Sequence, residues 1–92
     1  MKKENIEKTI AIMEDEFDTH KFIEKYIIKY EEEYVELLYS HKLLGKKGIF
    51  KAAHSEIGKC LAKSDKLKKL DRSSSENIKK YKTKNQNWRK IS

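Results

Sequence analysis

The chain has no proline and only three glycines, one cysteine and one tryptophan among its 92 residues. A single cysteine excludes an internal disulfide and is typical of a protein from a reducing compartment. No apolar run approaches the roughly 20 residues that a membrane span needs, and the N-terminus lacks the apolar core of a signal peptide. We therefore expect a cytoplasmic protein that does not enter a membrane.

Arginine is also scarce, because only Arg72 and Arg89 are arginines among the 22 basic residues. Lysine is a point charge that suits phosphate groups, whereas the planar fork of arginine suits bidentate contacts with guanine. A surface dominated by lysine predicts binding that is mostly electrostatic and salt-dependent, with modest base specificity.

Residue groups typical of catalysis or metal binding are missing from the sequence. The three histidines and Cys60 do not have the spacing of metal ligands, and His54 and Cys60 fall on different faces of a helix. The acidic run 31–33 has no acid or base partner from another element, and there is no phosphate-binding glycine motif. We expect a protein that is not an enzyme and uses no metal or other cofactor.

Charge is abundant and unevenly distributed along the chain. Charged residues make up 40% of the chain and apolar residues 37%, with a formal net charge of +7. Residues 1–44 contain seven Lys/Arg and eleven Asp/Glu, a net of −4, whereas residues 45–92 contain fifteen and four, a net of +11. This segregation favours an anionic partner for residues 45–92. The alternative is that the lysines only keep the surface soluble.

Length and composition fit one small domain, residues 1–92. Nine aromatic residues and regular apolar spacing argue against disorder. By pattern, the chain divides into an N-terminal helix (1–17), a helical core (18–63) and a basic hairpin with a C-terminal anchor (64–92). The expected fold class is mainly α with a small β part (α+β).

Apolar residues recur at helical spacing in four segments. We expect helices at about 3–15, 19–29, 31–43 and 49–63. Asp18 and Thr19 are an N-cap signal for the second helix, and the acids at 31–33 suit the first turn of the third. Because no proline or glycine separates these two helices, one long helix across 19–43 is the alternative.

The segment Gly45-Lys46-Lys47-Gly48 is the clearest linker in the chain. In the helix after it, apolar residues repeat at three, four and four and are expected to face the core. They are Phe50, Ala53, Ile57 and Leu61. The other side is polar and small, and it includes Gly58. Glycine lowers helix stability by about 1 kcal/mol relative to alanine, which indicates close approach of another helix or of a ligand.

The periodicity changes after Asp65, where lysines are interleaved with few apolar residues. We expect a β-hairpin that pairs about 66–72 with 76–82, followed by a short turn or helix at 84–88. Trp88 is expected to plug the core and fix the C-terminus, rather than to stack on bases.

Three helices followed by a basic hairpin give Thr19–Tyr81 the element order of winged helix-turn-helix domains, which this segment resembles. The pattern Ser55-x-Ile57-Gly58-x-x-Leu61 is similar to the small-residue and apolar spacing of helix-turn-helix helices. The resemblance implies that Ile49–Lys63 is the recognition helix, which would enter the major groove. It also implies that Lys66–Tyr81 is the wing, which would contact the backbone or the minor groove.

A second register of the motif is the alternative, with Ser55–Lys63 as its first helix and Asp65–Leu70 as its second. In the first register, base contacts are expected from His54, Ser55, Lys59 and Arg72. Backbone contacts are expected from Lys51, Lys63, Lys66, Lys68, Lys69, Lys79, Lys80 and Lys82. The simpler interpretations are that the lysines form a solvated face and that His54 is a partly buried helix residue.

We therefore expect a small nucleic-acid-binding protein, a regulator or the product of a mobile element. Duplex DNA is favoured over RNA, because the aromatic signatures of RNA-binding domains are missing. The alternative is a protein-interaction module, an inhibitor or a homodimer that uses the acidic helices of residues 19–43. In that case Tyr26, Tyr30 and Tyr34 would form a half-exposed face that a partner covers.

Overall fold

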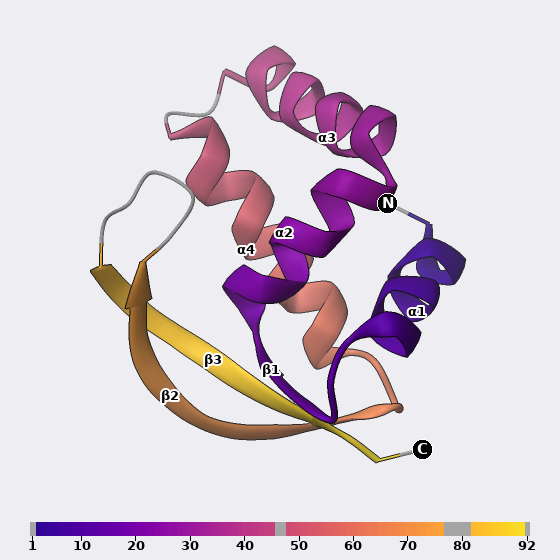
Figure 1. The fold of residues 1–92 in the computed structure, drawn as a ribbon. Coiled ribbons are helices and arrows are strands. Elements are labelled where there is room, and N and C mark those ends of the chain that lie inside the picture. The colour runs from indigo at the N-terminus through magenta and orange to yellow at the C-terminus, as the bar shows by residue number, and fades with distance from the viewer. Residues whose placement is uncertain (1, 46–47, 77–81, 92) are drawn as a thin grey trace.

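The computed structural model describes residues 2–45, 48–76 and 82–91 (Figure 1). In chain order, these residues form α1 (Lys3–Ile12), β1 (Glu16–Asp18), α2 (Thr19–Lys29), α3 (Glu31–Leu43), α4 (Ile49–Ala62), β2 (Leu67–Glu76) and β3 (Lys82–Lys90). The described part of the chain is thus mainly helical and has a small antiparallel sheet, which confirms the expected α+β class.

The three strands of the described residues lie in the order β1-β3-β2, so that β3 is the central strand. Phe17 in β1 pairs with Trp88 in β3, and a register shift between Lys69 and Arg72 interrupts the ladder between β2 and β3. Figure 1 shows the helices on one side of the sheet, with α3 at the end of the helical layer farthest from it. The sheet joins the front of the chain to its C-terminal end.

One hydrophobic core connects the described helices to the sheet. α2 and α4 supply its centre, because each has a row of side chains at helical spacing with no solvent exposure. These rows are Phe22, Ile23 and Tyr26 in α2 and Ala53, Ile57 and Leu61 in α4. Ile6 and Ile10 close the core from α1, and Trp88 closes it from β3. The expected core face of α4 is confirmed at three positions, whereas Phe50 is exposed.

α2 and α3 are separate helices, so the alternative of one long helix across 19–43 is wrong. The side chain of Asp18 caps α2 by accepting a hydrogen bond of 2.8 Å from the Lys21 backbone amide. Tyr30 leaves the helical conformation with φ −130° and ψ 53°, and α3 then starts with three glutamates in its first turn. Negative charge is favourable at a helix N-terminus, so both sequence signals act as expected.

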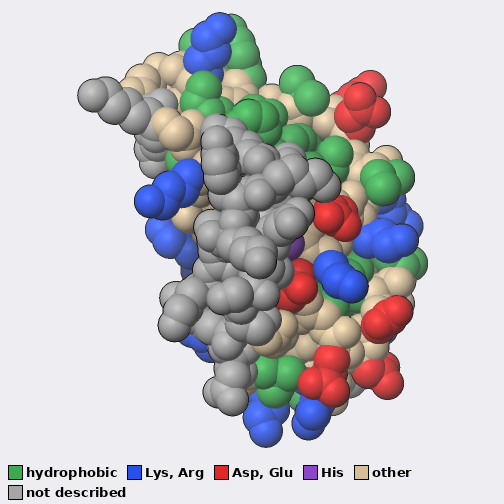
Figure 2. Space-filling model, turned by 60° about the vertical axis from the view of Figure 1, so that its left-hand side comes forward, with side chains coloured by type: hydrophobic (Ala, Val, Ile, Leu, Met, Phe, Trp, Pro, Cys, Tyr) green, Lys and Arg blue, Asp and Glu red, His purple; other side chains and the backbone are tan. Residues whose placement is uncertain are grey.

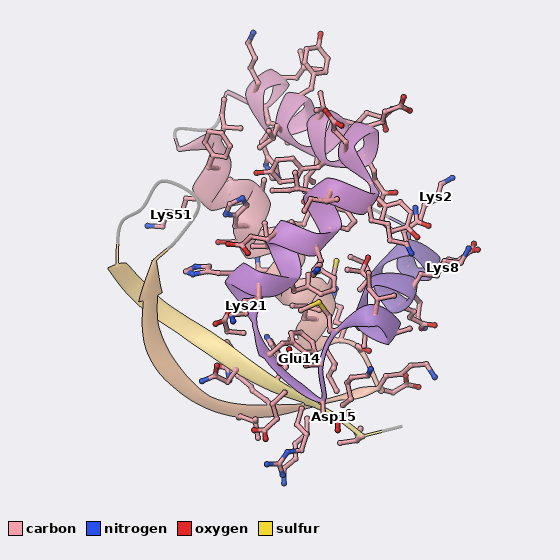
Figure 3. All side chains as sticks on the ribbon, in the orientation of Figure 1. Lys2, Lys8, Glu14, Asp15, Lys21 and Lys51 are labelled. Carbon is pink, nitrogen blue, oxygen red and sulfur yellow. The ribbon has the colours of Figure 1, made fainter. Side chains whose placement is uncertain are left out.

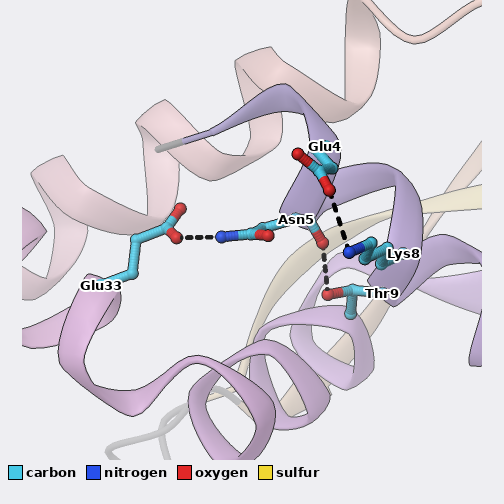
Figure 4. A network of polar contacts seen from close by, with 5 residues as sticks. All are labelled: Glu4, Asn5, Lys8, Thr9 and Glu33. Carbon is cyan, nitrogen blue, oxygen red and sulfur yellow. Dashed lines mark hydrogen bonds and ion pairs between the residues drawn. The ribbon is translucent and has the colours of Figure 1, made fainter.

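Glu33 connects α1 and α2 to the start of α3, and Figure 4 shows its contact with Asn5 of α1. Its carboxylate accepts hydrogen bonds from the Asn5 side-chain amide and from the Tyr26 hydroxyl, the second at 2.7 Å. The Lys2 backbone amide donates a third bond of 2.9 Å. Burial alone raises the pKa of Glu33, but the bonds from Tyr26 and Asn5 outweigh it and hold the pKa below its usual value. Glu33 is therefore a charged link between three helices.

The hairpin differs from the expected one in its second strand. β2 extends to Glu76, and its partner is Lys82–Lys90 rather than about 76–82. The expected turn or helix at 84–88 is wrong, because these residues belong to β3. The run Lys84–Asn87 has no apolar alternation, so its strand conformation depends on pairing with neighbouring strands and not on its own pattern.

The sequence pattern also does not predict β1, and it places the end of the first helix too late. α1 ends at Ile12 instead of near residue 15. The acids at 14–16 are unfavourable at the negative end of a helix dipole. The chain extends there instead, and Phe17 becomes buried opposite Trp88.

Two of the three central tyrosines are core residues and not part of a half-exposed face. Tyr26 has no solvent exposure, Tyr34 is buried, and Tyr30 is half-buried against the same core. Tyr26 lies between two aromatic rings: it stacks on Phe22 with ring centroids 6.2 Å apart and meets Tyr30 in a tilted arrangement at 5.8 Å. The expectation of a partner surface built on these tyrosines is therefore wrong.

Candidate nucleic-acid interface

α4 carries the candidate recognition surface, and the linker before it sets where the helix begins. Gly48 directly precedes α4 with a φ of 65°, in the left-handed region that glycine adopts without strain. Ala53, Ile57 and Leu61 then fix one side of α4 against the core. The opposite side is consequently turned toward solvent.

The solvent side of α4 is basic and made of small residues. Lys51, Ser55 and Lys59 recur every four residues and are exposed. Ala62 and Lys63 are exposed at the end of the same side. Side chains at this spacing lie along one helix face. The structure therefore brings four predicted site residues together on one surface, which we call the α4 basic face (Lys51, Ser55, Lys59, Ala62 and Lys63).

Gly58 lies within this surface, three residues after Ser55 and four before Ala62. A Cβ atom added to Gly58 would meet no heavy atom within 4 Å outside the nearby backbone of α4. No second helix of the described residues approaches it, so packing among these residues does not explain this glycine. The predicted set of site residues omits Gly58 and Ala62, although their spacing with Ser55 was the signal that could have identified them.

His54 of α4 packs against α3. Its Nε2 lies 2.8 Å from the Tyr34 hydroxyl, with which it shares a hydrogen bond. Its ring lies 5.9 Å from the ring of Tyr34 and 6.1 Å, edge to face, from that of Phe50. Burial, with a smaller contribution from His20, lowers the pKa of His54. His54 is thus a partly buried helix residue, as the simpler interpretation has it, and its contact with bases stays a prediction.

Lys68 lies on a different surface from the α4 basic face. It pairs with Arg89, whose guanidinium is 3.4 Å from the Glu16 carboxylate. Successive residues of a strand point to opposite faces of the sheet, and the neighbouring Trp88 points into the core. Lys68 and Arg89 therefore lie on the outer face of the sheet, on the side opposite the helices, and the structure separates Lys68 from the rest of the predicted site.

The other predicted hairpin residues are located only in part. Lys66 and Lys69 are exposed at the start of the hairpin. Arg72 lies in β2 and Lys82 is the first residue of β3, whereas 79–80 (Lys79 and Lys80) fall outside the described residues. Figure 1 shows the hairpin running back from the C-terminal end of α4 toward the side where α4 begins.

Lys51 lies at the end of α4 toward which the hairpin extends. Figure 3 shows its side chain directed to the side of the molecule where the described parts of β2 and β3 end. Lys63, in contrast, follows the last turn of α4, next to the start of the hairpin. Figure 2 shows Lys and Arg side chains along the left edge of this view and a mixture of acidic and basic side chains along the right.

The described residues were also compared with the geometry of metal sites and membrane spans. No group of three or more His, Cys, Asp or Glu side chains in residues 2–45, 48–76 and 82–91 could hold a metal ion. Cys60 is half-buried, and burial raises the pKa of its thiol, which is typical of an unreactive cysteine. Within the same residues, the longest helices are too short and too polar to cross a membrane.

Comparison with known proteins identifies no relative. No protein-family model, no curated protein and no solved structure matches this chain.

Proposed function

We propose that this protein binds duplex DNA as a small, non-enzymatic regulator, with α4 in the major groove and the β2–β3 hairpin against the backbone. The order α2, α3, α4 and hairpin supports the resemblance to winged helix-turn-helix domains that the sequence suggests. The observation that carries the proposal is the α4 basic face, where exposed lysines flank small residues on the solvent side of one helix.

Two residues on this side of α4 are unfavourable for the helix itself. Lys51 places a positive charge in the first turn, which has no acidic residue, at the positive end of the helix dipole. Gly58 lowers helix stability by about 1 kcal/mol relative to alanine, and its surroundings are open. Local choices that oppose stability concentrate at functional sites. A bound phosphate near Lys51 and a groove wall near Gly58 would offset both.

The dimensions of the α4 basic face fit the major groove. Lys51 and Lys59 are eight residues apart, or about 12 Å along the helix, and the major groove is about 12 Å wide. The lysines can thus reach phosphates while Ser55 and Gly58 between them approach base edges. With His54 packed against Tyr34, few side chains remain for base contacts. We therefore expect strong electrostatic binding and modest sequence specificity.

A role in protein interaction is the second candidate, and one observation favours it. α3 exposes Val35, Tyr39 and Leu43 on its outer side, away from the core. This surface does not involve the buried tyrosines, and it is compatible with DNA binding through α4.

Titration of a labelled DNA duplex at several salt concentrations tests the proposal. If about six lysines contact phosphate, a plot of log K against log salt has a slope of about −5. Affinity should then fall by about four orders of magnitude between about 50 and about 300 mM salt. Absence of binding at about 50 mM salt, or affinity that does not change with salt, would contradict DNA binding. An RNA duplex of the same sequence should bind more weakly, because its deep, narrow major groove excludes a helix.

A further inference from the structure

α3 has apolar side chains on both of its sides. Its inner side places Tyr34 and Leu37 in the core. Its outer side exposes Val35, Tyr39 and Leu43, at 56%, 57% and 69% of their surfaces. These three residues recur every four positions and therefore lie in one row along the helix. A helix that only covers a core is typically polar on its outer side.

Exposed apolar side chains are concentrated at this helix. Eight large hydrophobic side chains are exposed in the described residues, and half of them are Val35, Tyr39, Leu43 and Leu44. Figure 2 shows hydrophobic side chains gathered at the top of the molecule, the end at which Figure 1 places α3. Gathered exposed apolar residues mark an interaction surface.

The charged side chains beside the apolar row can complement those of a second copy of α3. The N-terminal half of α3 exposes Glu31, Glu32 and Glu36. The C-terminal half exposes Lys42. A second copy of α3, turned by 180° about an axis through Tyr39, sets the acidic half of each helix beside the basic end of the other. Val35 lies four residues before Tyr39 and Leu43 four residues after it. The same rotation therefore brings Val35 of each copy opposite Leu43 of the other.

The geometry points to a homodimer in which α3 packs antiparallel against α3 of a second copy, with Tyr39 at the two-fold axis. Apolar contact is continuous along the row, and Lys42 of each copy lies toward the acidic first turn of the other. A single helix face buries less than the roughly 800 Å² per partner of a standard interface. The dimer is therefore expected to be weak and transient. This inference does not depend on DNA binding, because it uses a different surface.

Sedimentation equilibrium of the full chain tests the dimer directly. The average mass should rise from one chain toward two between about 10 μM and about 1 mM protein. Tyr39→Glu places two negative charges at the axis and should weaken association at least about tenfold. Ile12→Glu is the matched control, because it makes the same kind of change at a similarly exposed residue of α1. A chain that is monomeric at about 1 mM would overturn the inference and leave this surface for a different protein.

Disulfide cross-linking separates the antiparallel arrangement from other dimers. Val35→Cys and Leu43→Cys are introduced singly into a Cys60→Ser chain, so that only the new thiol can react. With an added oxidant, a mixture of the two variants should form a cross-linked heterodimer, because Val35 of one copy lies opposite Leu43 of the other. Each variant alone should cross-link poorly. Preferential cross-linking of Val35→Cys to itself would contradict the antiparallel arrangement, whether or not Tyr39→Glu folds well.

Discussion

The indole Nε1 of Trp88 donates a hydrogen bond of 2.9 Å to the Thr19 hydroxyl, which joins β3 to the first residue of α2. The same hydroxyl donates a bond of 3.2 Å to the Gln86 backbone carbonyl. Trp88 is buried opposite Phe17, so one side chain connects the sheet, α2 and the core. The expected role of Trp88 as a core plug is confirmed, and this plug fixes the hairpin against the helices.

Removing this connection should destabilise the protein strongly. Trp88→Ala leaves a large cavity and should lower the free energy of unfolding by about 3–5 kcal/mol. Thr19→Val deprives the buried indole N–H of its acceptor and should lower it by about 1–3 kcal/mol. Urea unfolding followed by circular dichroism measures both. Ile91→Ala, at an exposed residue of the same chain end, should stay within about 0.5 kcal/mol. A Thr19→Val protein as stable as the wild type would contradict the proposed anchor.

Glu33 should contribute more to stability than its exposed neighbour Glu32. Glu33→Ala removes the acceptor of the buried Tyr26 hydroxyl and should lower the free energy of unfolding by about 1–3 kcal/mol. Glu32→Ala removes one charge from the same helical turn and should change it by less than about 0.5 kcal/mol. Urea unfolding at neutral pH compares the two. Equal effects would show that the Glu33 network is not important for folding.

The contribution of Glu33 should also depend on pH. Its pKa is lower in the folded protein than the usual value of 4.5. As the solution is acidified, Glu33 therefore takes up a proton in the unfolded chain before it does so in the folded protein. Its contribution to the free energy of unfolding is complete above pH 4.5 and is lost as pH falls toward the folded pKa. The difference in stability between wild type and Glu33→Ala should accordingly shrink below pH 4.5. A difference that stays constant under acid conditions would rule out the charged link.

The helices of this chain could be predicted from sequence, because their signals are local. The cap at Asp18 acts within one turn, and the row of Phe22, Ile23 and Tyr26 identifies the buried face of α2 without reference to the rest of the fold. The strands could not be predicted in the same way. β1 has one buried apolar residue, Phe17, and becomes a strand because Trp88, near the other end of the chain, pairs with it.

Helical periodicity could predict only part of the candidate surface. Helical spacing identified Lys51, Ser55 and Lys59 as one face. Sequence spacing does not show that the Tyr34 hydroxyl, from another helix, lies 2.8 Å from His54 Nε2. Lys68 was grouped with these lysines by charge alone, although strand pairing puts it on the outer face of the sheet.

Gly58 and Gly48 should respond oppositely to the same substitution. Gly58→Ala adds a methyl group in open space within a helix and should raise the free energy of unfolding by up to about 1 kcal/mol. Gly48→Ala forces an alanine into the left-handed region, at a φ of 65°, and should lower it by about 1 kcal/mol. If Gly58 allows DNA to approach α4, the more stable Gly58→Ala protein should bind DNA more weakly. Unchanged affinity would remove Gly58 from the interface.

Burial of His54 predicts that stability falls under mildly acidic conditions. The pKa of His54 is lowered in the folded protein, so the unfolded chain takes up a proton first as pH falls below the usual value of 6.5. The contribution of neutral His54 to the free energy of unfolding is complete above this pH. Below it, the free energy of unfolding should decrease by at most about 1.4 kcal/mol per pH unit. His54→Asn keeps a polar partner for Tyr34 and should remove this decrease. Urea unfolding between about pH 7.5 and about pH 5.5 tests it, and an unchanged slope in the variant would assign the effect to other groups.

Charge reversal on α4, compared with an equal reversal on α2, tests the account most directly. Lys51→Glu with Lys59→Glu changes the α4 basic face, whereas Lys25→Glu with Lys29→Glu makes the same net change at exposed lysines of α2. Fluorescence titration of a DNA duplex at about 100 mM salt should show that the α4 variant binds at least about 100-fold more weakly and with a shallower salt slope. The α2 variant should lose much less affinity. Equal losses in two folded variants, or no loss in the α4 variant, would contradict the assignment of α4 as the DNA-binding helix.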